Sequence, residues 1–471
     1  MSVCRIFAFR SHPIQLELLF ELAISNAQEG HKVIIHWGGE DVFFNDIYKG
    51  RISNLWGRPF YRMYSKVREK GLDISLDDVW LKTRFDAHPI IDAQADSVFD
   101  YYNLKFEEYE MGTAAISSCT DIFGVDVTAL EVNDVKAFFN MVMSSNVNVN
   151  QTAKKFLRKN HTDKVLVFNG RFGAEAAVAD AAKSCSVPCF FYEWIANTGY
   201  ICWPFQIHNI RGVRGVIADF WATGSQRQNT ETARAWLDER RKSTSFKLWE
   251  NSDTQTSFEK IEDRTAFLAV NKLPNNYFVF FQSSDDEVNG VSAFARGVFP
   301  WKSQLEFVEN LVRALPDDAT LVLRLHPNMQ DKKEIDTQRW HRLASRFDKI
   351  IFFDERSTID SYSLSEHAAK VLCFGSTIGG EALYLGTPVL SGSRAYYEDA
   401  QGYVELQSYR HTIESLYSKI EVQQDSVLPW AYFRAAFTGI EPGSFVATGK
   451  YDVEFEGVNY WKGILTNRSK K

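Results

Sequence analysis

The stretch KVLCFGSTIGGEALYLGTPVL, residues 370–390, decides the fold class of this 471-residue chain. Residues 370–374 form a mostly apolar run that predicts a strand, and residues 377–385 have the spacing of a helix that ends at Gly386. Another short apolar run begins at Val389. A strand, a helix and a second strand in this order imply a parallel sheet.

The same alternation extends over both halves of the chain. The expected strands are short apolar runs at residues 3–9, 32–36, 165–168, 189–192, 277–281, 320–325, 349–353, 370–374 and 389–390. The expected helices have amphipathic or alanine-rich spacing and lie at residues 14–28, 173–184, 304–315, 358–369 and 377–385. The sequence therefore predicts an α/β protein with doubly wound sheets.

Changes in composition divide the chain into two expected domains. A Rossmann-like domain at residues 1–225 contains an insertion at about 41–110 that is rich in aromatic and charged residues, and we expect this insertion to be mainly helical. Residues 226–262 are polar and poor in periodicity, so they predict a linker. A second Rossmann-like domain is expected at residues 263–471.

Composition also limits the classes of function and partner. The net charge of -7 argues against a general nucleic-acid binder, which needs a basic face. The six cysteines are scattered without the paired spacing of a metal site, which favours free thiols in a reducing compartment. No signal peptide is apparent and no apolar run approaches transmembrane length, so we expect a cytoplasmic protein and leave peripheral membrane contact open.

Ligands of open parallel sheets bind beyond the carboxyl ends of the strands, so the residues directly after each strand are the candidates for a site. In CFGSTIGGE, residues 373–381, Gly375 permits a tight turn and Ser376 or Thr377 caps the next helix. The amino end of that helix can bind a phosphate through its backbone N–H groups, and Glu381 can accept hydrogen bonds from ribose hydroxyls. The alternative is an N-capped core helix whose glycines serve packing.

Three other strand ends of the second half carry polar residues, and one of them is followed by Asp354 and Glu355. His326 and Pro327 follow TLVLRL, and the imidazole can donate to a phosphate or to a leaving group, although a lone histidine is often structural. Ser283, Ser284 and Asp285 follow YFVFF and are further donor-side candidates. The acids that begin at Asp285 are consecutive, so their side chains diverge, and no matching ligand run appears elsewhere. We therefore expect no metal ion.

The strand ends of the first half are expected to form the acceptor side. Arg10 follows the first strand, and Asn169 and Arg171 follow VLVF. If a group is transferred to the hydroxyl of an acceptor, a base must take the proton of that hydroxyl. Glu193, after CFFY, is the first candidate for this base and His12 is the second. The alternative for Glu193 is a structural acid that caps a helix or forms an ion pair.

These motifs resemble those of bacterial capsule-polysaccharide biosynthesis glycosyltransferases and, more distantly, of β-Kdo transferases. The clear match covers residues 281–390, including FQSSDDE at 281–287, RLHPN at 324–328 and the stretch from Ser357 to Leu390. A shorter match covers FNGR at 168–171 and YEW at 192–194.

The resemblance implies a GT-B-like fold, with two Rossmann-like domains facing a cleft, and a metal-independent reaction. It assigns donor binding to His326, Pro327, Ser376, Thr377 and Glu381. In the β-Kdo enzymes a Glu-Asp-Gly sequence follows a strand of the first domain and carries the base. Here Trp194 follows Glu193, and this departure leaves the Kdo donor and the base open.

Together, the residues and the resemblance predict an inverting, metal-independent glycosyltransferase without a cofactor. We expect it to transfer a sugar, of hexosyl or Kdo type, from a nucleotide-sugar to a surface polysaccharide, a glycan or a lipid-linked glycan. One alternative is a sugar-nucleotide 2-epimerase of the same fold, which needs no acceptor site, so the aromatic insertion favours transfer. The other is a non-catalytic glycan-assembly subunit, which would not need the two donor motifs on one rim.

Overall fold

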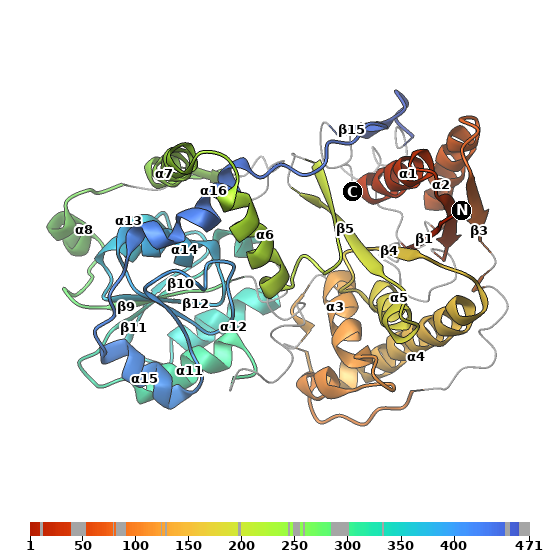
Figure 1. The fold of residues 1–471 in the computed structure, drawn as a ribbon. Helices are drawn as coiled ribbons and strands as arrows, with labels where there is room; N and C mark the ends of the chain where they lie inside the picture. Colours follow the sequence, from red (N-terminus) through yellow and green to blue (C-terminus); the bar gives the residue numbers. More distant parts are fainter. Residues whose placement is uncertain are drawn as a thin grey trace. The chain divides into compact units, whose positions relative to one another are not determined.

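The computed structural model contains two compact units (Figure 1). Unit 1 consists of Met1–Phe123, Leu130–Ile207 and Thr438–Lys471, and unit 2 consists of Gly124–Ala129 and His208–Phe437. The structure describes residues 1–9, 13–38, 53–78, 80–81, 91–123, 125–127, 130–195, 199–243, 245–247, 255–257, 260–283, 301–331, 334–447 and 453–460.

Unit 1 is built on a six-stranded sheet of order β3-β2-β1-β4-β5-β6. All neighbouring strands are parallel except β5 and β6, which are antiparallel. The strands are β1 (Val3–Ala8), β2 (Lys32–Trp37), β3 (Ile74–Asp77), β4 (Lys164–Phe168), β5 (Cys189–Ile195) and β6 (Gly199–Trp203). Their central members are apolar runs because helices cover both faces of such a sheet.

Helices pack on the two faces of this sheet (Figure 1). On one face, α1 (Pro13–Gln28) and α2 (Ser53–Arg68) share a buried core with β1, β2 and β4. On the other face lie α4 (Val132–Lys159) and α5 (Gly173–Ser184), and α3 (Met111–Phe123) packs against both of them. The expected helical insertion at about 41–110 thus includes a helix, α2, but it also supplies the edge strand β3 and the short 3-10 helix η3 (Val98–Asn103).

Unit 2 is built on a six-stranded sheet of order β11-β10-β9-β12-β13-β14, in which every neighbouring pair is parallel. The strands are β9 (Phe278–Phe281), β10 (Leu321–Arg324), β11 (Ile350–Phe353), β12 (Lys370–Cys373), β13 (Val389–Ser391) and β14 (Tyr403–Glu405). Numbered along the chain within each unit, both sheets have the strand order 3-2-1-4-5-6. This is the Rossmann arrangement, so the predicted pair of Rossmann-like domains is confirmed.

Helices also lie on both faces of the second sheet. One face packs against α11 (Gln304–Ala314), α12 (Glu334–Ala344) and α15 (Tyr409–Tyr417) around an aromatic and aliphatic core. The elements associated with the other face are α13 (Ser361–His367), α14 (Thr377–Leu385), η6 (Gln424–Val427) and α16 (Leu428–Ala436). The helix α8 (Arg264–Val270) precedes β9, and the 3-10 helix η5 (Pro327–Asp331) follows β10.

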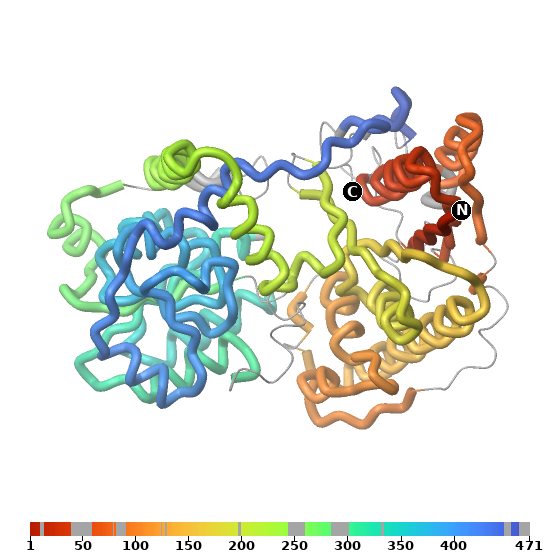
Figure 2. The backbone as a smooth tube through the Cα atoms, viewed as in Figure 1, coloured from red at the N-terminus to blue at the C-terminus, as the bar shows by residue number. Residues whose placement is uncertain are grey.

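The segment expected to be a linker, residues 226–262, contains regular structure. It begins with α7 (Gln226–Lys242), which follows α6 (Ile210–Ala222), and its later part contains the antiparallel pair β7 (Ser245–Lys247) and β8 (Gln255–Ser257). Figure 2 shows α6 and α7 side by side with α16, although α16 lies almost two hundred residues later in the chain. Both α6 and α7 therefore belong to unit 2, because α16 packs against them.

The C-terminal segment lies in unit 1, whereas the expected second domain extended to residue 471. Glu21 of α1 accepts hydrogen bonds from the backbone N–H groups of Gly443 (3.0 Å) and Ser444 (2.7 Å). The strands β15 (Phe445–Ala447) and β16 (Val453–Phe455) follow as an antiparallel pair, and their phenylalanines are buried in the core beneath α1. These contacts join distant parts of the sequence, so a local pattern could not indicate them.

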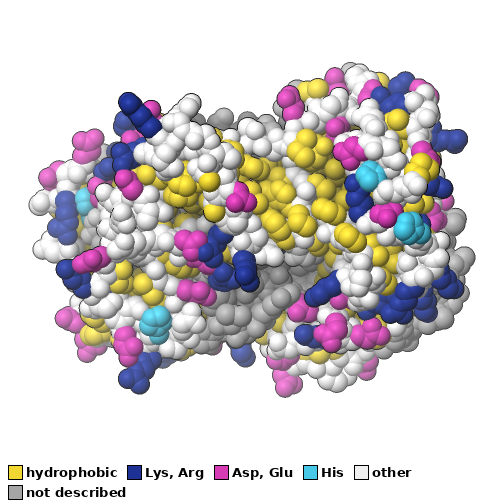
Figure 3. Space-filling model, viewed as in Figure 1, with side chains coloured by type: hydrophobic (Ala, Val, Ile, Leu, Met, Phe, Trp, Pro, Cys, Tyr) yellow, Lys and Arg dark blue, Asp and Glu magenta, His cyan; other side chains and the backbone are white. Residues whose placement is uncertain are grey.

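The described surface gives two further facts about the molecule. None of the helices in the described ranges is both long and apolar enough to cross a membrane. Figure 3 shows basic and acidic side chains interspersed over the visible face, with hydrophobic side chains gathered over α6 and α16. There, the ring of Phe220 stacks on Tyr432 with centroids 4.9 Å apart.

Candidate functional site

A pocket lies at the carboxyl edge of the unit 2 sheet. Its lining includes residues that follow β9, β10 and β12. The strand order reverses between β9 and β12, and ligands of such sheets bind at this point. The residues that line it are Arg240, Phe281, Gln282, Arg324, Leu325, His326, Pro327, Asp360, Ser361, Tyr362, Ser376, Thr377, Ile378 and Glu381.

His326 is oriented by hydrogen bonds on both its backbone and its ring. Its backbone N–H donates to Oε1 of the buried Gln282 (3.1 Å), and its Nδ1 accepts from the backbone N–H of Asn328 (3.1 Å). In a neutral imidazole whose Nδ1 accepts, Nε2 carries the proton, and this assignment follows from the hydrogen-bond network. The Nε2–H group can then donate to an anionic ligand of the pocket.

The amino end of α14 forms another side of the pocket. Ser376 is the N-cap residue, in extended conformation, and its side chain makes no capping hydrogen bond. Ser376, Thr377 and Ile378 all line the pocket. The first backbone N–H groups of a helix have no partner within it and carry partial positive charge, so this end of α14 is suited to an anion.

Neighbouring atoms leave no room for a side chain at three glycines in and after this turn. Gly375 has a φ of +64°, and a Cβ there would lie 2.8 Å from the backbone oxygen of Arg394. A Cβ at Gly379 would lie 2.2 Å from the hydroxyl oxygen of Tyr397, and one at Gly380 would lie 2.6 Å from the Trp430 ring. The structure therefore favours packing, the alternative left open above, as the role of Gly379 and Gly380.

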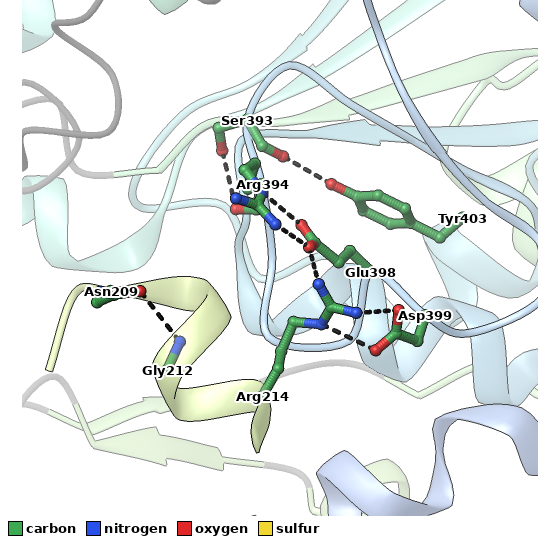
Figure 4. Close-up of polar contacts among 8 residues, drawn as sticks. All are labelled: Asn209, Gly212, Arg214, Ser393, Arg394, Glu398, Asp399 and Tyr403. Atoms are coloured by element: carbon green, nitrogen blue, oxygen red, sulfur yellow. Dashed lines mark hydrogen bonds and ion pairs between the residues drawn. The ribbon is translucent and has the colours of Figure 1, made fainter. Parts of the chain in front are cut away.

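Figure 4 shows the polar contacts that hold the loop at residues 393–399. The backbone oxygen of Arg394 in this loop lies beside Gly375. Glu398 accepts hydrogen bonds from Arg394 (Nε–Oε2 3.1 Å) in its own loop and from Arg214 of α6. Arg214 also donates to Asp399 (Nε–Oδ2 2.8 Å), and the Tyr403 hydroxyl donates to the backbone oxygen of Ser393 (2.7 Å). The loop after β13 is thus joined to α6 on one side and to β14 on the other.

Glu381 lies one turn into α14 and is 4% exposed. Its Oε1 accepts from Nε of Arg240 at 2.5 Å, and Tyr362 also hydrogen bonds to it. Burial works against the Arg240 cation, but the charge of Glu381, together with hydrogen bonds to Glu381 and Tyr362, outweighs it and raises the pKa of Arg240. Burial, followed by the charge of Glu381, raises the pKa of the Tyr362 hydroxyl, which therefore stays protonated and serves as a donor.

Arg324 is a pocket residue that the sequence analysis missed. It is 1% exposed, and its guanidinium donates to the backbone oxygens of Asp354 and Ser357 (Nη2–O 3.0 Å). Burial lowers the pKa of Arg324 to about 10, so it remains a cation at neutral pH, and its buried Nε makes no hydrogen bond. The signal was a basic residue at the end of an otherwise apolar strand run.

Arg240, Asp360 and Tyr362 are among the other lining residues that were missed, for different reasons. Arg240 lies in the segment expected to be a linker, and it is far along the chain from the strand ends, so its place in the pocket could not be predicted. Asp360 caps α13, accepting from the backbone N–H of Ser363 at Oδ2 (3.0 Å). Tyr362 lies in the first turn of the same helix. An aspartate before a helix is a capping signal, and it does not by itself indicate a site.

The donor-side candidates after β9 are Ser283, Ser284 and Asp285, and the structure describes only the first of them. The backbone of Ser283 is held by the buried Gln304, whose Oε1 accepts from its N–H and whose Nε2 donates to its oxygen, both at 3.0 Å. Ser283 is not among the residues that line the pocket. Ser284 and Asp285 lie outside the described residues.

In unit 1, the structure brings together Glu193, Asn169 and Arg171. Asn169 follows β4 with a φ of +51°, and its Nδ2 donates to Glu193 Oε2 at 2.5 Å. The backbone N–H of Trp194 donates to the other carboxylate oxygen at 3.1 Å, and that of Arg171 donates to Asn169 Oδ1 at 3.3 Å. The Arg171 guanidinium lies 4.3 Å from the centroid of the Phe172 ring.

Glu193 lies within a strand and not just beyond its end. We expected a strand at residues 189–192, but β5 continues to Ile195, where the antiparallel β6 provides a partner and pairs Ile201 with Glu193. Arg10 and His12, the other candidates of this half, lie outside the described residues. Among the described residues, no group of three histidine, cysteine or acidic side chains is arranged to hold a metal ion.

Residues 240–411 match the family model described as capsule polysaccharide biosynthesis protein. This segment includes every residue that lines the pocket, and the match confirms the resemblance that the motifs of residues 281–390 predicted. No curated protein sequence is significantly similar to the chain.

Solved structures similar to this chain include two transferases and an epimerase. The β-Kdo 2,7 transferase of Thermosulfurimonas dismutans KpsC is 15% identical, with 60% of this chain and 80% of that chain covered and a TM-score of 0.32. The β-Kdo 2,4 transferase of the same KpsC is 14% identical, with coverage of 57% and 79% and a TM-score of 0.35. The Methanocaldococcus jannaschii UDP-GlcNAc 2-epimerase, in complex with UDP-GlcNAc and UDP, is 11% identical, with coverage of 92% and 99% and a TM-score of 0.28.

Proposed function

We propose that this chain is a glycosyltransferase of capsule polysaccharide synthesis that binds a nucleotide-sugar in the unit 2 pocket. One observation carries the proposal: His326, the amino end of α14 and the buried Glu381 converge on a single pocket at the carboxyl edge of a Rossmann-like sheet. The match of residues 240–411 to the capsule polysaccharide family supports the biological setting.

The phosphate of the donor would bind at the start of α14. The backbone N–H groups there and the Nε2–H of His326 are donors suited to phosphate oxygens. The buried Arg324 adds a positive charge to the pocket wall. These groups would also stabilise the negative charge that develops on the phosphate as the sugar leaves, and such stabilisation is a major source of catalysis.

The nucleoside would be held by Glu381. An ionised carboxylate accepts hydrogen bonds and cannot donate them, so it suits the hydroxyls of a ribose. Glu381 lies one turn beyond Thr377, on the helix whose amino end would bind the phosphate. One short helix would therefore recognise two adjacent parts of the nucleotide.

For the transfer itself we propose that Glu193 acts as the general base and that the configuration of the sugar is inverted. The carboxylate takes the proton of the acceptor hydroxyl while the hydroxyl oxygen bonds to the anomeric carbon. The bond from that carbon to the donor phosphate breaks, and the nucleotide leaves with the electron pair. Asn169 donates to Glu193 and so fixes the orientation of the carboxylate.

The acceptor is proposed to be a growing glycan, free or linked to a lipid, and the protein is proposed to act in the cytoplasm. We also propose that transfer requires no metal ion, because His326, Arg324 and the amino end of α14 can together stabilise the negative charge of the phosphate. Transfer that persists in EDTA is expected. Loss of activity in EDTA and its recovery with Mg²⁺ or Mn²⁺ would show that a metal is needed.

The decisive experiment is a thermal-shift screen of nucleotide-sugars and free nucleotides, followed by transfer assays with the donor that binds. A ligand specific to the native state raises the melting temperature by mass action. Conversion of that donor to a 2-epimer without any acceptor would indicate an epimerase. Binding without transfer or epimerisation would indicate a glycan-assembly subunit, and no stabilisation by any nucleotide would refute the proposal.

A further inference from the structure

The carboxylate of Glu381 is held by a cation from a different part of unit 2. Arg240 lies in the last turn of α7, and its Nε donates to Glu381 Oε1 at 2.5 Å. The Glu381 side chain is 4% exposed and that of Arg240 is 35% exposed. Both Arg240 and the buried Glu381 that it contacts line the pocket.

Aromatic rings brace this ion pair. The Arg240 guanidinium lies 5.0 Å from the centroid of the Trp236 ring, which is one turn earlier in α7. Trp236 meets Trp430 edge to face with centroids 5.7 Å apart, and Trp430 fills the space beside Gly380 of α14. The cation and the helix that carries Glu381 are thus supported by the same pair of tryptophans.

Other contacts already fasten α7 to the rest of unit 2. Arg241 pairs with Glu366 and Arg234 pairs with Asp425, each at 2.6 Å. These two pairs are largely exposed, and neither includes a pocket residue. The Arg240 pair differs because its acid is buried in the pocket, where a carboxylate without a partner would be strongly unfavourable.

We propose that Arg240 is a positioning residue, which holds Glu381 ready to accept hydrogen bonds from ribose hydroxyls and so sets a preference for ribonucleotides over 2′-deoxyribonucleotides. The inference rests on the proposed function, because it requires a nucleotide in this pocket. Carboxylate oxygens have several lone pairs, so Glu381 can bind Arg240 and a ribose hydroxyl together. A carboxylate ordered before binding saves the cost of ordering it when the nucleotide arrives.

The test is calorimetric titration of the whole chain with UDP, CMP, GDP and ADP and with their 2′-deoxy counterparts. For the wild type we expect the 2′-deoxy form to bind about 10- to 100-fold more weakly, because it lacks a hydrogen bond to a charged group. In Arg240→Ala the ribonucleotide should lose most of this advantage while the affinity for the 2′-deoxy form changes little. Arg240→Lys, which keeps the charge, should restore part of the discrimination.

Arg241→Ala is the matched control, since it removes the neighbouring ion pair of α7 and leaves the pocket intact. It should keep the wild-type affinities, and the melting temperature of each variant shows whether the fold persists. If no nucleotide binds the wild type, the proposed function fails and the inference fails with it. If ribonucleotides bind but Arg240→Ala keeps the same discrimination, only the positioning role is refuted. Tighter binding by Arg240→Ala would also refute it, since Arg240 would then compete with the ribose.

Discussion

The two units share a strand order but carry opposite chemistry at the ends of their strands. In unit 2, Arg324, His326 and the amino end of α14 line one pocket, and Arg240 holds the acid Glu381 there. In unit 1, the corresponding edge presents the carboxylate of Glu193, which is held by the amide of Asn169. The same topology thus carries basic side chains and a helix amino end at the edge of one sheet and a carboxylate at the edge of the other. The side chains at this edge of each sheet, and not the shared fold, distinguish the two units chemically.

The largest expected effect comes from removing the basicity of Glu193. Glu193→Gln keeps the shape of the side chain but cannot take a proton, so the rate of transfer should fall by about 10²- to 10⁴-fold. Donor affinity should not change, because the donor is proposed to bind in unit 2. Steady-state transfer kinetics and donor titration measure the two effects separately. A wild-type rate would make Glu193 a structural acid, and His12 would be the next residue to change.

His326→Ala tests the pocket of unit 2, the second member of the comparison. Loss of one donor to the departing phosphate should lower the turnover by about 10²- to 10³-fold and weaken donor binding. Gln282 and Asn328 contact His326 through its backbone N–H and its ring, so the melting temperature should be checked in parallel. Unchanged transfer kinetics in a folded variant would show that His326 is structural.

Nine of the twelve strands in the two described sheets could be predicted, because buried parallel strands are continuous apolar runs. The edge strands β3, β6 and β14 were missed. The helix α7 was missed because only Asn229, Ala233 and Leu237 of its residues are buried, so its pattern looks like that of a polar linker. The contacts of Arg240 with Glu381 join residues far apart in sequence, and nothing local indicates them. Of the candidates that line the pocket, Ser376, Thr377 and His326 could be singled out because each closely follows a strand end. Glu381 could be singled out because it lies one turn into the helix that follows.

A smaller effect is expected from Arg324→Met. This change removes a buried cation whose hydrogen bonds go to backbone oxygens and not to a carboxylate. The affinity for the nucleotide that the screen identifies should fall about tenfold, roughly the contribution of one charge-assisted interaction. The affinity for the corresponding uncharged nucleoside should not change. An equal loss for nucleotide and nucleoside would mean that Arg324 supports the fold of the pocket and not the phosphate.

The smallest effect distinguishes packing from ligand approach at the start of α14. A Cβ at Gly379 would lie 2.2 Å from the Tyr397 hydroxyl, which itself donates to the backbone oxygen of the N-cap Ser376 at 2.5 Å. Gly379→Ala should therefore destabilise the fold by about 1–3 kcal/mol through overpacking, even without nucleotide. Gly215→Ala in α6 is the matched control, because a Cβ there meets nothing within 4 Å. It should stabilise the fold by about 0.5–1 kcal/mol, since alanine favours a helix interior.

Urea unfolding of the nucleotide-free variants measures both changes on one scale. Opposite signs for Gly379→Ala and Gly215→Ala would show that Gly379 is needed because Tyr397 occupies the space beside it. If Gly379→Ala were instead as stable as the wild type and bound nucleotide more weakly, the glycine would serve the approach of the ligand. In that case the unit 2 site would differ from the unit 1 edge in two ways, by its charge and by a backbone that a ligand can approach closely.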